Sequence, residues 1–274
     1  MDAHLDCGPC VLRQAIDAAR RTGASEQTQK QVLKQAADAI SEMRFDETPM
    51  ALASRVQQVV REETKSDDPF AETKEIANEE VQKLLPAFER RLERADDRFE
   101  TAVRLAIAGN IIDVGPGHEI DIEETVEDVL EQPFAIDHLD TLRTDLESAE
   151  NVLYLADNAG EIVLDRLLVG ELDATVEVVV KDQPFLNDAL FRDAQTAGIG
   201  EVSTVRTRGS DGVGTVSPAF ERRLRDADVV ISKGQGNYEL FSESEANMYF
   251  LFIVKCAVVA DDIGAPEGRI VCSQ

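Results

Sequence analysis

The first 112 residues have the hydrophobic spacing of helices. Val11, Ala15 and Ala19 recur every four residues and predict an apolar helix face. Capping residues and prolines mark where such helices begin, and glycines mark where they end. We expect helices from Pro9 to Gly23, after Ser25, after Thr48-Pro49, after Asp68-Pro69 and over 98–109, with a kink or break at Pro86.

From residue 151 the pattern changes to short β-branched runs separated by helix-like segments. The predicted strands are 151–157, 175–182, 201–208 and 227–234, and the predicted helices between them are 160–171, 187–197 and 217–226. Such alternation indicates a parallel, doubly wound sheet. The last apolar run, 248–264, fits either a strand or a buried helix, and 115–150 is mixed and loop-like with a short helix at 139–148.

These patterns predict an α/β protein in which a helical N-terminal region precedes a three-layer α/β/α Rossmann-like sandwich with a mainly parallel sheet. We divide the chain into an N-terminal helical subdomain (1–66), a second helical subdomain (67–112) and the sandwich (113–274), which we expect to carry the binding site. No run of about 18 apolar residues predicts a membrane span. The N-terminus does not resemble a signal peptide, so we expect a cytoplasmic protein.

Acidic residues dominate the charge of the chain. It has 54 Asp and Glu against 28 Lys and Arg, for a formal net charge of −26. Such a surface repels phosphate backbones, so we do not expect nucleic acid as a partner. The acidic residues are spread through periodic segments, which argues against a disordered acidic tail. We interpret them as an adaptation to a high-salt cytoplasm, where screening weakens repulsion between carboxylates.

Four cysteines in a chain expected to be intracellular argue against a disulfide framework. Cys7 and Cys10 form the sequence CGPC, whose spacing fits a redox pair or, with His4, part of a metal site. No second cysteine pair supplies a fourth zinc ligand, and no predicted strand precedes the motif. The simplest interpretation is two small buried residues at a helix start, with redox and metal roles left open.

Polar side chains follow three predicted strands at the points where the strands end. In a parallel sheet these ends meet at one edge, and ligands bind there. Asp157, Asn158 and Asp188 offer hard oxygen ligands, which favour Mg²⁺, Mn²⁺ or a similar divalent cation. The other polar residues expected at this edge are Lys181, Asp182, Asn187 and the loop Lys233-Gly234-Gln235-Gly236-Asn237.

This KGQGN loop has features of a phosphate site. Its two glycines allow close backbone approach, and successive N–H groups can cradle a phosphate. Lys233 and Lys255 would add positive charge. Simpler alternatives exist for single residues: a turn and helix cap at Asp157-Asn158, a lysine at 255 that extends to the surface, and a helix end at Asn110. Convergence on one sheet edge favours a binding site.

The chain contains, in order, the motifs CGPC, AGNIID, LADNAGE, VKDQPFLND, SKGQGNYE and Lys255-Cys256, and the match spans about residues 4–264. This ordered set resembles the DUF89 family of metal-dependent damage-control phosphatases. The match is closest to the archaeal-type subfamily, which carries the N-terminal CxxC. The resemblance implies the same fold and hydrolysis of phosphate esters of sugars or damaged metabolites with Mn²⁺, Co²⁺, Ni²⁺ or Mg²⁺.

The resemblance also implies roles by position. The implied metal-binding and catalytic residues are Asp157, Asn158 and Asp188. The implied phosphate- and substrate-binding residues are Lys233, Gly234, Gln235, Gly236, Asn237 and Lys255, to which we add Asn110 and Asp113 of AGNIID. Where the eukaryotic branch of the family has Arg-Thr-x-Lys, this chain reads Phe252-Ile-Val-Lys255, so only the lysine is retained.

We therefore expect a metal-dependent phosphatase, a phosphoric monoester hydrolase that acts on a small phosphorylated metabolite. One alternative is a non-hydrolytic phosphometabolite-binding protein that uses the same loop. A methyltransferase that binds adenosylmethionine is another. It would need a glycine-rich turn after the first strand, which 157–160 fits poorly, and an acid at the end of the second, which Asp182 supplies.

Overall fold

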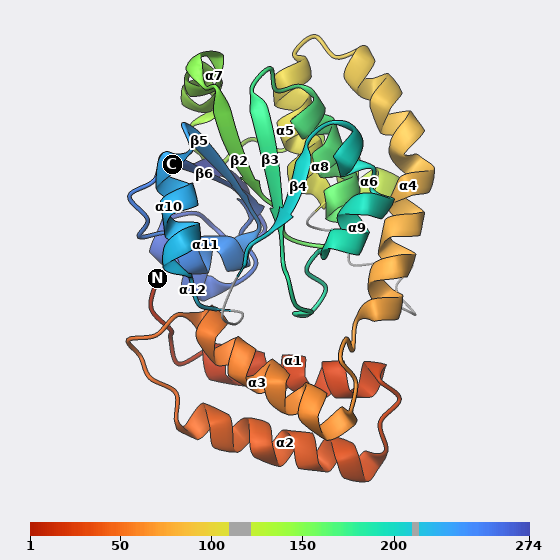
Figure 1. Cartoon of the computed structure of the whole chain (residues 1–274), viewed down its shortest axis with the longest axis vertical. Coiled ribbons are helices and arrows are strands. Elements are labelled where there is room, and N and C mark those ends of the chain that lie inside the picture. Colours follow the sequence, from red (N-terminus) through yellow and green to blue (C-terminus); the bar gives the residue numbers. More distant parts are fainter. Residues whose placement is uncertain (110–121, 210–213) are drawn as a thin grey trace.

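A seven-stranded sheet forms the centre of the protein (Figure 1). We describe it from a computed structural model, in which residues 1–109, 122–209 and 214–274 are described. Every pair of neighbouring strands is parallel except β6 and β7. Across the sheet the strands are β1 (Ile136–Asp137), β7 (Ile270–Ser273), β6 (Met248–Ile253), β5 (Val229–Lys233), β2 (Asn151–Leu155), β3 (Thr175–Val180) and β4 (Thr204–Thr207).

Helices precede the sheet in the chain and then alternate with its strands. The early helices are α1 (Cys7–Arg21), α2 (Glu26–Ser41), α3 (Pro49–Thr64), α4 (Ala71–Glu93), α5 (Arg98–Ala108), α6 (Ile122–Glu131) and α7 (Leu139–Ser148). Those between and after the central strands are α8 (Glu161–Gly170), α9 (Phe191–Thr196), the 3₁₀ helix η2 (Ile199–Glu201), α10 (Pro218–Asp226), α11 (Gln235–Phe241) and α12 (Ala257–Ile263).

Alternating side chains of each strand supply two apolar faces. On β2, Val152 and Tyr154 pack in a cluster with residues of α4, α5, α7 and α8. Leu153 and Leu155 pack in a second cluster, with residues of α10, α11 and α12. The period of two along a strand puts neighbouring residues on opposite faces, so both faces of this sheet are covered. The predicted three-layer α/β/α sandwich with a mainly parallel sheet is confirmed.

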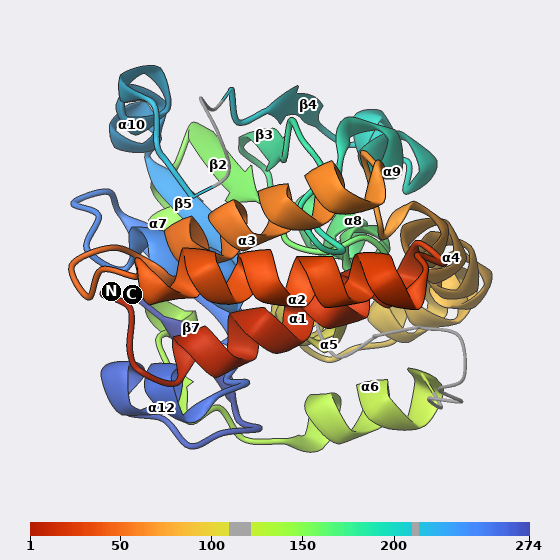
Figure 2. The ribbon, with the colours of Figure 1, turned by 90° about the horizontal axis from the view of Figure 1, so that it is seen from below.

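Helices α1, α2 and α3 lie across one end of the sandwich (Figure 2). Their apolar side chains form a cluster of their own, which Phe70 and Phe185 join from outside these helices. In contrast, α4 and α5 share their cluster with the sheet. We therefore propose that 1–66 is a subdomain, while the boundary expected between 112 and 113 lies outside the described residues.

Several elements differ from the sequence predictions. Helix α4 is continuous through Pro86, so the expected break is wrong; Leu85 and Phe88 on either side of the proline are buried, and their packing retains the helix. The run 248–264, predicted to be either a strand or a buried helix, contains both: strand β6 and, after it, helix α12. Helix α6 and the strands β1 and β7 were not predicted. None of the described helices is long and apolar enough to cross a membrane.

Candidate active site

The chain leaves the adjacent strands β2 and β5 toward opposite faces of the sheet. Helix α8 follows β2 on the face covered by α4 and α5, whereas α11 follows β5 on the other face. Such a switch in direction opens a crevice at the carboxyl ends of the strands. Asp157 and Asn158 follow β2, and the loop from Gly234 follows β5, so the structure brings these two predicted segments together as expected.

Asp188 joins this site because the loop after β3 is tied to the loop after β2. The Ala189 N–H donates to Asp157 O at 2.7 Å, and Asn158 and Asp188 face each other in an isolated antiparallel bridge. Leu186 precedes this bridge with φ of 45°, a conformation that is unfavourable for a bulky side chain. A strained turn therefore delivers Asp188 beside Asp157 and Asn158.

Two of the three predicted ligands are carboxylates, and with Glu161 they make the site acidic. Asp157 and Asp188 are only 9% and 6% exposed. Burial raises the pKa of Asp188, and burial together with the Glu161 and Asp188 carboxylates raises the pKa of Asp157 well above its usual range. No three His, Cys, Asp or Glu side chains of the described ranges are grouped so that they could hold a metal ion. A metal site here would therefore depend on the amide oxygen of Asn158.

Gly234 serves Asp157 and not a phosphate. Its φ is 78° and its ψ is 157°, a conformation that is essentially restricted to glycine. A Cβ atom at this position would lie 1.9 Å from Asp157 Oδ2. The Gly234 N–H already donates to Leu251 O at 3.2 Å. The expectation that this N–H contacts a phosphate is therefore wrong, and the glycine instead makes room for the carboxylate.

Lys233 is buried beneath the site. Its side chain is fully buried, and its Nζ donates to Ala106 O, Glu161 Oε1 and Asp165 Oδ1, each at 2.7 Å. Burial alone would lower the pKa of Lys233, but Asp165 and Glu161 outweigh it and raise the value to about 12. All three N–H groups have acceptors within the protein, so the predicted contact of Lys233 with a phosphate is wrong.

Asn237 is also structural. Its Nδ2 donates to Lys233 O at 2.8 Å and to Ala156 O at 3.2 Å, so the side chain connects the ends of β5 and β2. Its Oδ1 accepts from Lys181 Nζ at 3.2 Å. Asn237 is 2% exposed and does not line the pocket, so the prediction that it contacts a phosphate is wrong. It instead holds Lys181, whose Nζ lies 3.4 Å from Asp188 Oδ2.

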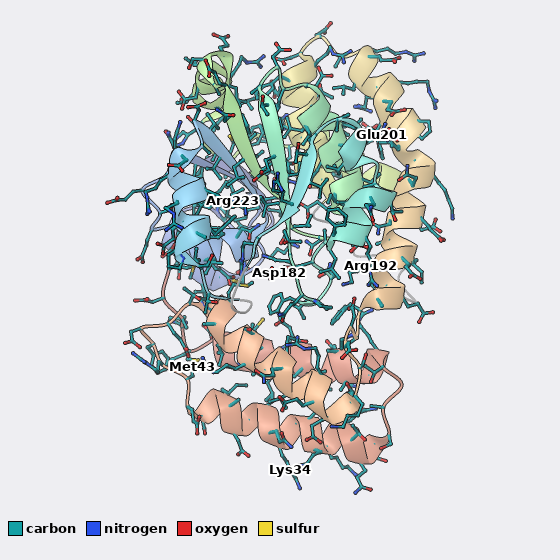
Figure 3. The ribbon with its side chains drawn as sticks, in the orientation of Figure 1. Lys34, Met43, Asp182, Arg192, Glu201 and Arg223 are labelled. Atoms are coloured by element: carbon teal, nitrogen blue, oxygen red, sulfur yellow. The ribbon has the colours of Figure 1, made fainter. Side chains whose placement is uncertain are left out.

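A pocket of about 520 Å³ contains the three predicted ligands. Of the other residues expected at this edge, Gln235, Gly236, Lys255, Lys181 and Asn187 line it. Its other walls include parts of α1, the start of α3, Phe70, Phe185 and the segment after β6. Asp182, labelled in Figure 3, lies at the same end of the sheet but does not line the pocket. Asn110 and Asp113 are outside the described residues.

The CGPC cysteines line the same pocket, together with Cys256. Cys10 is exposed and Cys7 is half-buried, so the expectation that both are buried is wrong. Partial desolvation by the surrounding pocket, with smaller contributions from neighbouring acidic groups, raises the pKa of both thiols, which disfavours the reactive thiolate. Gln235 Nε2 lies 3.4 Å from Cys256 Sγ, on the wall formed after β5 and β6.

Sequence reasoning missed Asn78 on α4. Its Oδ1 accepts from the Gly160 N–H at 2.7 Å, and its Nδ2 donates to Asp193 Oδ1 at 2.8 Å. The other oxygen of Asp193 accepts from the Leu190 N–H at 2.8 Å. One buried amide thus connects the turn after Asn158 to the segment after Asp188. An Asn in the middle of a helix is the only sequence signal for such a role.

Another cleft, of about 650 Å³, lies between the end of α4 and the start of α5. Four arginines line it, but Arg91 pairs with Glu127 and Arg104 pairs with Glu100. It contains none of the predicted site residues, and it lies away from the carboxyl ends of the strands. We therefore assign the active site to the pocket at the switch point.

Comparison with known proteins shows the family to which the chain is similar over nearly its whole length. Residues 3–271 match the family model described as the damage-control phosphatase ARMT1-like domain. A damage-control phosphatase of Archaeoglobus fulgidus is 32% identical over 97% of this chain and 96% of its own length. A damage-control phosphatase of Pyrococcus horikoshii is 38% identical over 76% of this chain and 75% of its own. The crystal structure of a DUF89 family protein from Pyrococcus horikoshii has a TM-score of 0.90 and 32% identity, over 100% of this chain and 99% of that one.

The close approach of Gly234 to Asp157 generates a prediction. Gly234→Ala should displace the Asp157 carboxylate and lower the free energy of unfolding by about 1–3 kcal/mol more than the same change elsewhere. Gly264→Ala is the comparison: Gly264 has the same φ of 78° and nothing within 4 Å of a Cβ atom, but its ψ of 30° is the left-handed conformation, which Ala tolerates better than that of Gly234. The excess loss in Gly234→Ala therefore reports the backbone conformation at 234 together with the contact with Asp157. Urea unfolding of both variants measures the difference, and equal losses would contradict a specific contact with Asp157.

Proposed function

The chain belongs to the damage-control phosphatase ARMT1-like family, DUF89, and we propose that it is a divalent-metal-dependent phosphatase that acts on a small phosphorylated metabolite. The observation that carries this proposal is the gathering of Asp157, Asn158 and Asp188 with two lysines in one pocket. The pocket lies at the switch point of the sheet, where ligands of open α/β sheets bind. Its volume of about 520 Å³ suits a small ligand.

The chemistry of these residues fits a hard cation. Two buried carboxylates and a third carboxylate nearby repel one another, and their proximity raises the pKa of Asp157 in addition to the effect of burial. We propose that Asp157, Asn158 and Asp188 hold Mn²⁺, Co²⁺, Ni²⁺ or Mg²⁺. Such an ion would polarise the phosphoryl group and stabilise the charge of the transition state.

Lys181 and Lys255 are the proposed phosphate-binding residues. Lys181 is 5% exposed and fixed by Asn237 and Asp188, so its ammonium is pre-positioned in the pocket wall. Lys255 is exposed at the end of β6, and its backbone N–H donates to Gln235 Oε1 at 2.9 Å. Two cations in the same pocket as the carboxylates would hold the phosphoryl oxygens and balance the charge of the dianion.

The N-terminal helices would provide the site for the rest of the substrate. Val11 and Met50 line the pocket from α1 and α3, and Phe70 and Phe185 line it beside them. These apolar side chains exclude water from the reacting groups and limit the size of the leaving group. Gln14 and Asp17 on α1 add polar groups for a leaving group with hydroxyls.

Replacing Asp157 tests this proposal. We expect Asp157→Asn to lower the rate of phosphate release from p-nitrophenyl phosphate or sugar phosphates by more than about 100-fold, because even changes around a metal's ligands cost about 10–100-fold. The melting temperature without metal should be unchanged or higher, since one of the crowded carboxylates becomes neutral.

Asp261→Asn is the control, because Asp261 is exposed on α12 and does not line the pocket. If Asp157→Asn with Mn²⁺ retained the turnover of the wild type, the proposed active site would be wrong. Tight binding of phosphometabolites without phosphate release, across all four metals, would instead favour a binding protein.

The raised pKa values of Asp157 and Asp188 predict competition between protons and metal. Both acids retain their protons to higher pH than an ordinary Asp, and a cation must displace those protons. We expect the dissociation constant for Mn²⁺ to increase as pH falls toward the raised pKa values of Asp157 and Asp188, by up to about tenfold per pH unit for each proton displaced. Calorimetry in two buffers of different ionisation enthalpy counts the protons released. A constant affinity without proton release would contradict the assignment.

We also propose that the acidic surface adapts the protein to a high-salt cytoplasm. The net charge of −26 destabilises the folded state through self-repulsion, and salt reduces this effect as the screening length falls from about 10 Å at 0.1 M to about 3 Å at 1 M. The melting temperature should therefore increase with KCl and increase less in sucrose of equal osmolality. A melting temperature that is independent of KCl would contradict this proposal.

A further inference from the structure

We propose that Glu161 is a positioning residue that turns the amide oxygen of Asn158 toward the metal. This inference rests on the proposed function and extends it to a side chain that does not line the pocket. Asn158 is the weakest of the three proposed ligands, because a neutral amide has an acceptor oxygen at one end and a donor nitrogen at the other. Only one of its two orientations can bind a cation.

Two carboxylates select that orientation. Asn158 Nδ2 donates to Asp157 Oδ2 at 2.8 Å and to Glu161 Oε2 at 3.1 Å. Both hydrogens of the amide are thereby used, and Oδ1 is the atom that remains for a ligand. The flipped amide would place Oδ1 against two carboxylate oxygens, an arrangement without a donor. Asp157 is itself a proposed ligand, so Glu161 is the partner whose sole role toward Asn158 is orientation.

Glu161 is held firmly enough to do this. It is fully buried in the first turn of α8, and its Oε1 accepts from Lys233 Nζ at 2.7 Å. A Cβ atom on Gly109 would lie 2.9 Å from the Glu161 Cα, so the end of α5 packs directly against this residue. The ammonium of Lys233 offsets the charge of the buried carboxylate. Lys233 therefore supports the site from below without contact with substrate.

The second carboxylate that contacts Lys233 provides a matched comparison. Asp165 Oδ1 accepts from Lys233 Nζ and from the Tyr154 hydroxyl, each at 2.7 Å. Asp165 is fully buried, as Glu161 is, and lies one turn further along α8. The described contacts of Asp165 do not include Asn158. The two acids thus share the contact with Lys233, and among the described contacts only Glu161 of the two has a hydrogen bond to Asn158.

The test compares Glu161→Gln with Asp165→Asn. In Glu161→Gln we expect the new amide oxygen to face Lys233, because the Lys233 ammonium can only donate. The NH₂ group of the new side chain would then point at the NH₂ group of Asn158, where two donors face each other without an acceptor. We expect the dissociation constant for Mn²⁺ to increase by about 10–100-fold, and turnover to recover at saturating Mn²⁺. For Asp165→Asn we expect an affinity within about threefold of the wild type.

Direct calorimetry of Mn²⁺ binding gives the result without any substrate. Affinity within about threefold of the wild type in Glu161→Gln would overturn the inference, provided that Asp157→Asn has lost binding. Wild-type affinity in Asp157→Asn as well would mean that the proposed metal site itself is wrong. Equal losses in Glu161→Gln and Asp165→Asn would also overturn the inference, because they would show a general effect of the buried charges.

Glu161→Asp is a second variant that tests the inference if Glu161→Gln does not fold. It retains the negative charge that Lys233 needs, but its shorter side chain withdraws the acceptor from Asn158 Nδ2. We expect it to melt cooperatively and still lose affinity for Mn²⁺. Wild-type affinity in folded Glu161→Asp would overturn the inference.

Discussion

One buried ammonium group holds the active-site end of this protein together. Lys233 at the end of β5 donates to Ala106 O on α5 and to Glu161 and Asp165 on α8. A central strand is thereby joined to the two helices that cover one of its faces. The ammonium is fully buried, so water cannot reach it. Loss of any one acceptor would therefore leave one of its N–H groups without a hydrogen bond, which is costly.

The polar residues at this edge of the sheet fall into two groups, those buried within the sandwich and those that line the pocket. Lys233 and Asp165 lie within the sandwich, where their charges are matched against each other. Asp157, Asn158 and Asp188 lie above them, where acidic side chains face the pocket. Glu161 connects the two groups, since one oxygen accepts from Lys233 and the other from Asn158. The carboxylates that crowd around the pocket repel one another, which favours the binding of a cation.

The apolar cluster of the N-terminal helices forms part of the pocket wall. Helices α1, α2 and α3 bury their own cluster of side chains, separate from those on the two faces of the sheet. Phe185, from the loop after β3, packs in that N-terminal cluster and also lines the pocket. Arg192 on α9, labelled in Figure 3, donates a hydrogen bond from Nη2 to Asp68 Oδ2 at 2.7 Å, and Asp68 lies just before α4. The loops that carry the site are therefore held by both parts of the chain.

Much of this arrangement follows from the sequence by itself. Runs of β-branched residues with helical segments between them are sufficient to predict a parallel sheet, and the rule that ligands bind at strand ends brings Asp157, Asn158 and Asp188 to one place. Local sequence also determined the helix starts at Ser25 and Thr48, whose side chains accept from backbone N–H groups three residues later.

Tertiary structure decided which polar side chains face the pocket. Lys233 and Lys181 both follow β-branched runs at strand ends, yet Lys233 points into the sandwich and Lys181 lines the pocket. Glu161 looks like an ordinary acid in the first turn of a helix, where the helix dipole favours it, until its contacts with Lys233 and Asn158 are seen. Sequence pattern shows where a strand ends, but the direction of the next side chain depends on partners that are distant in the chain.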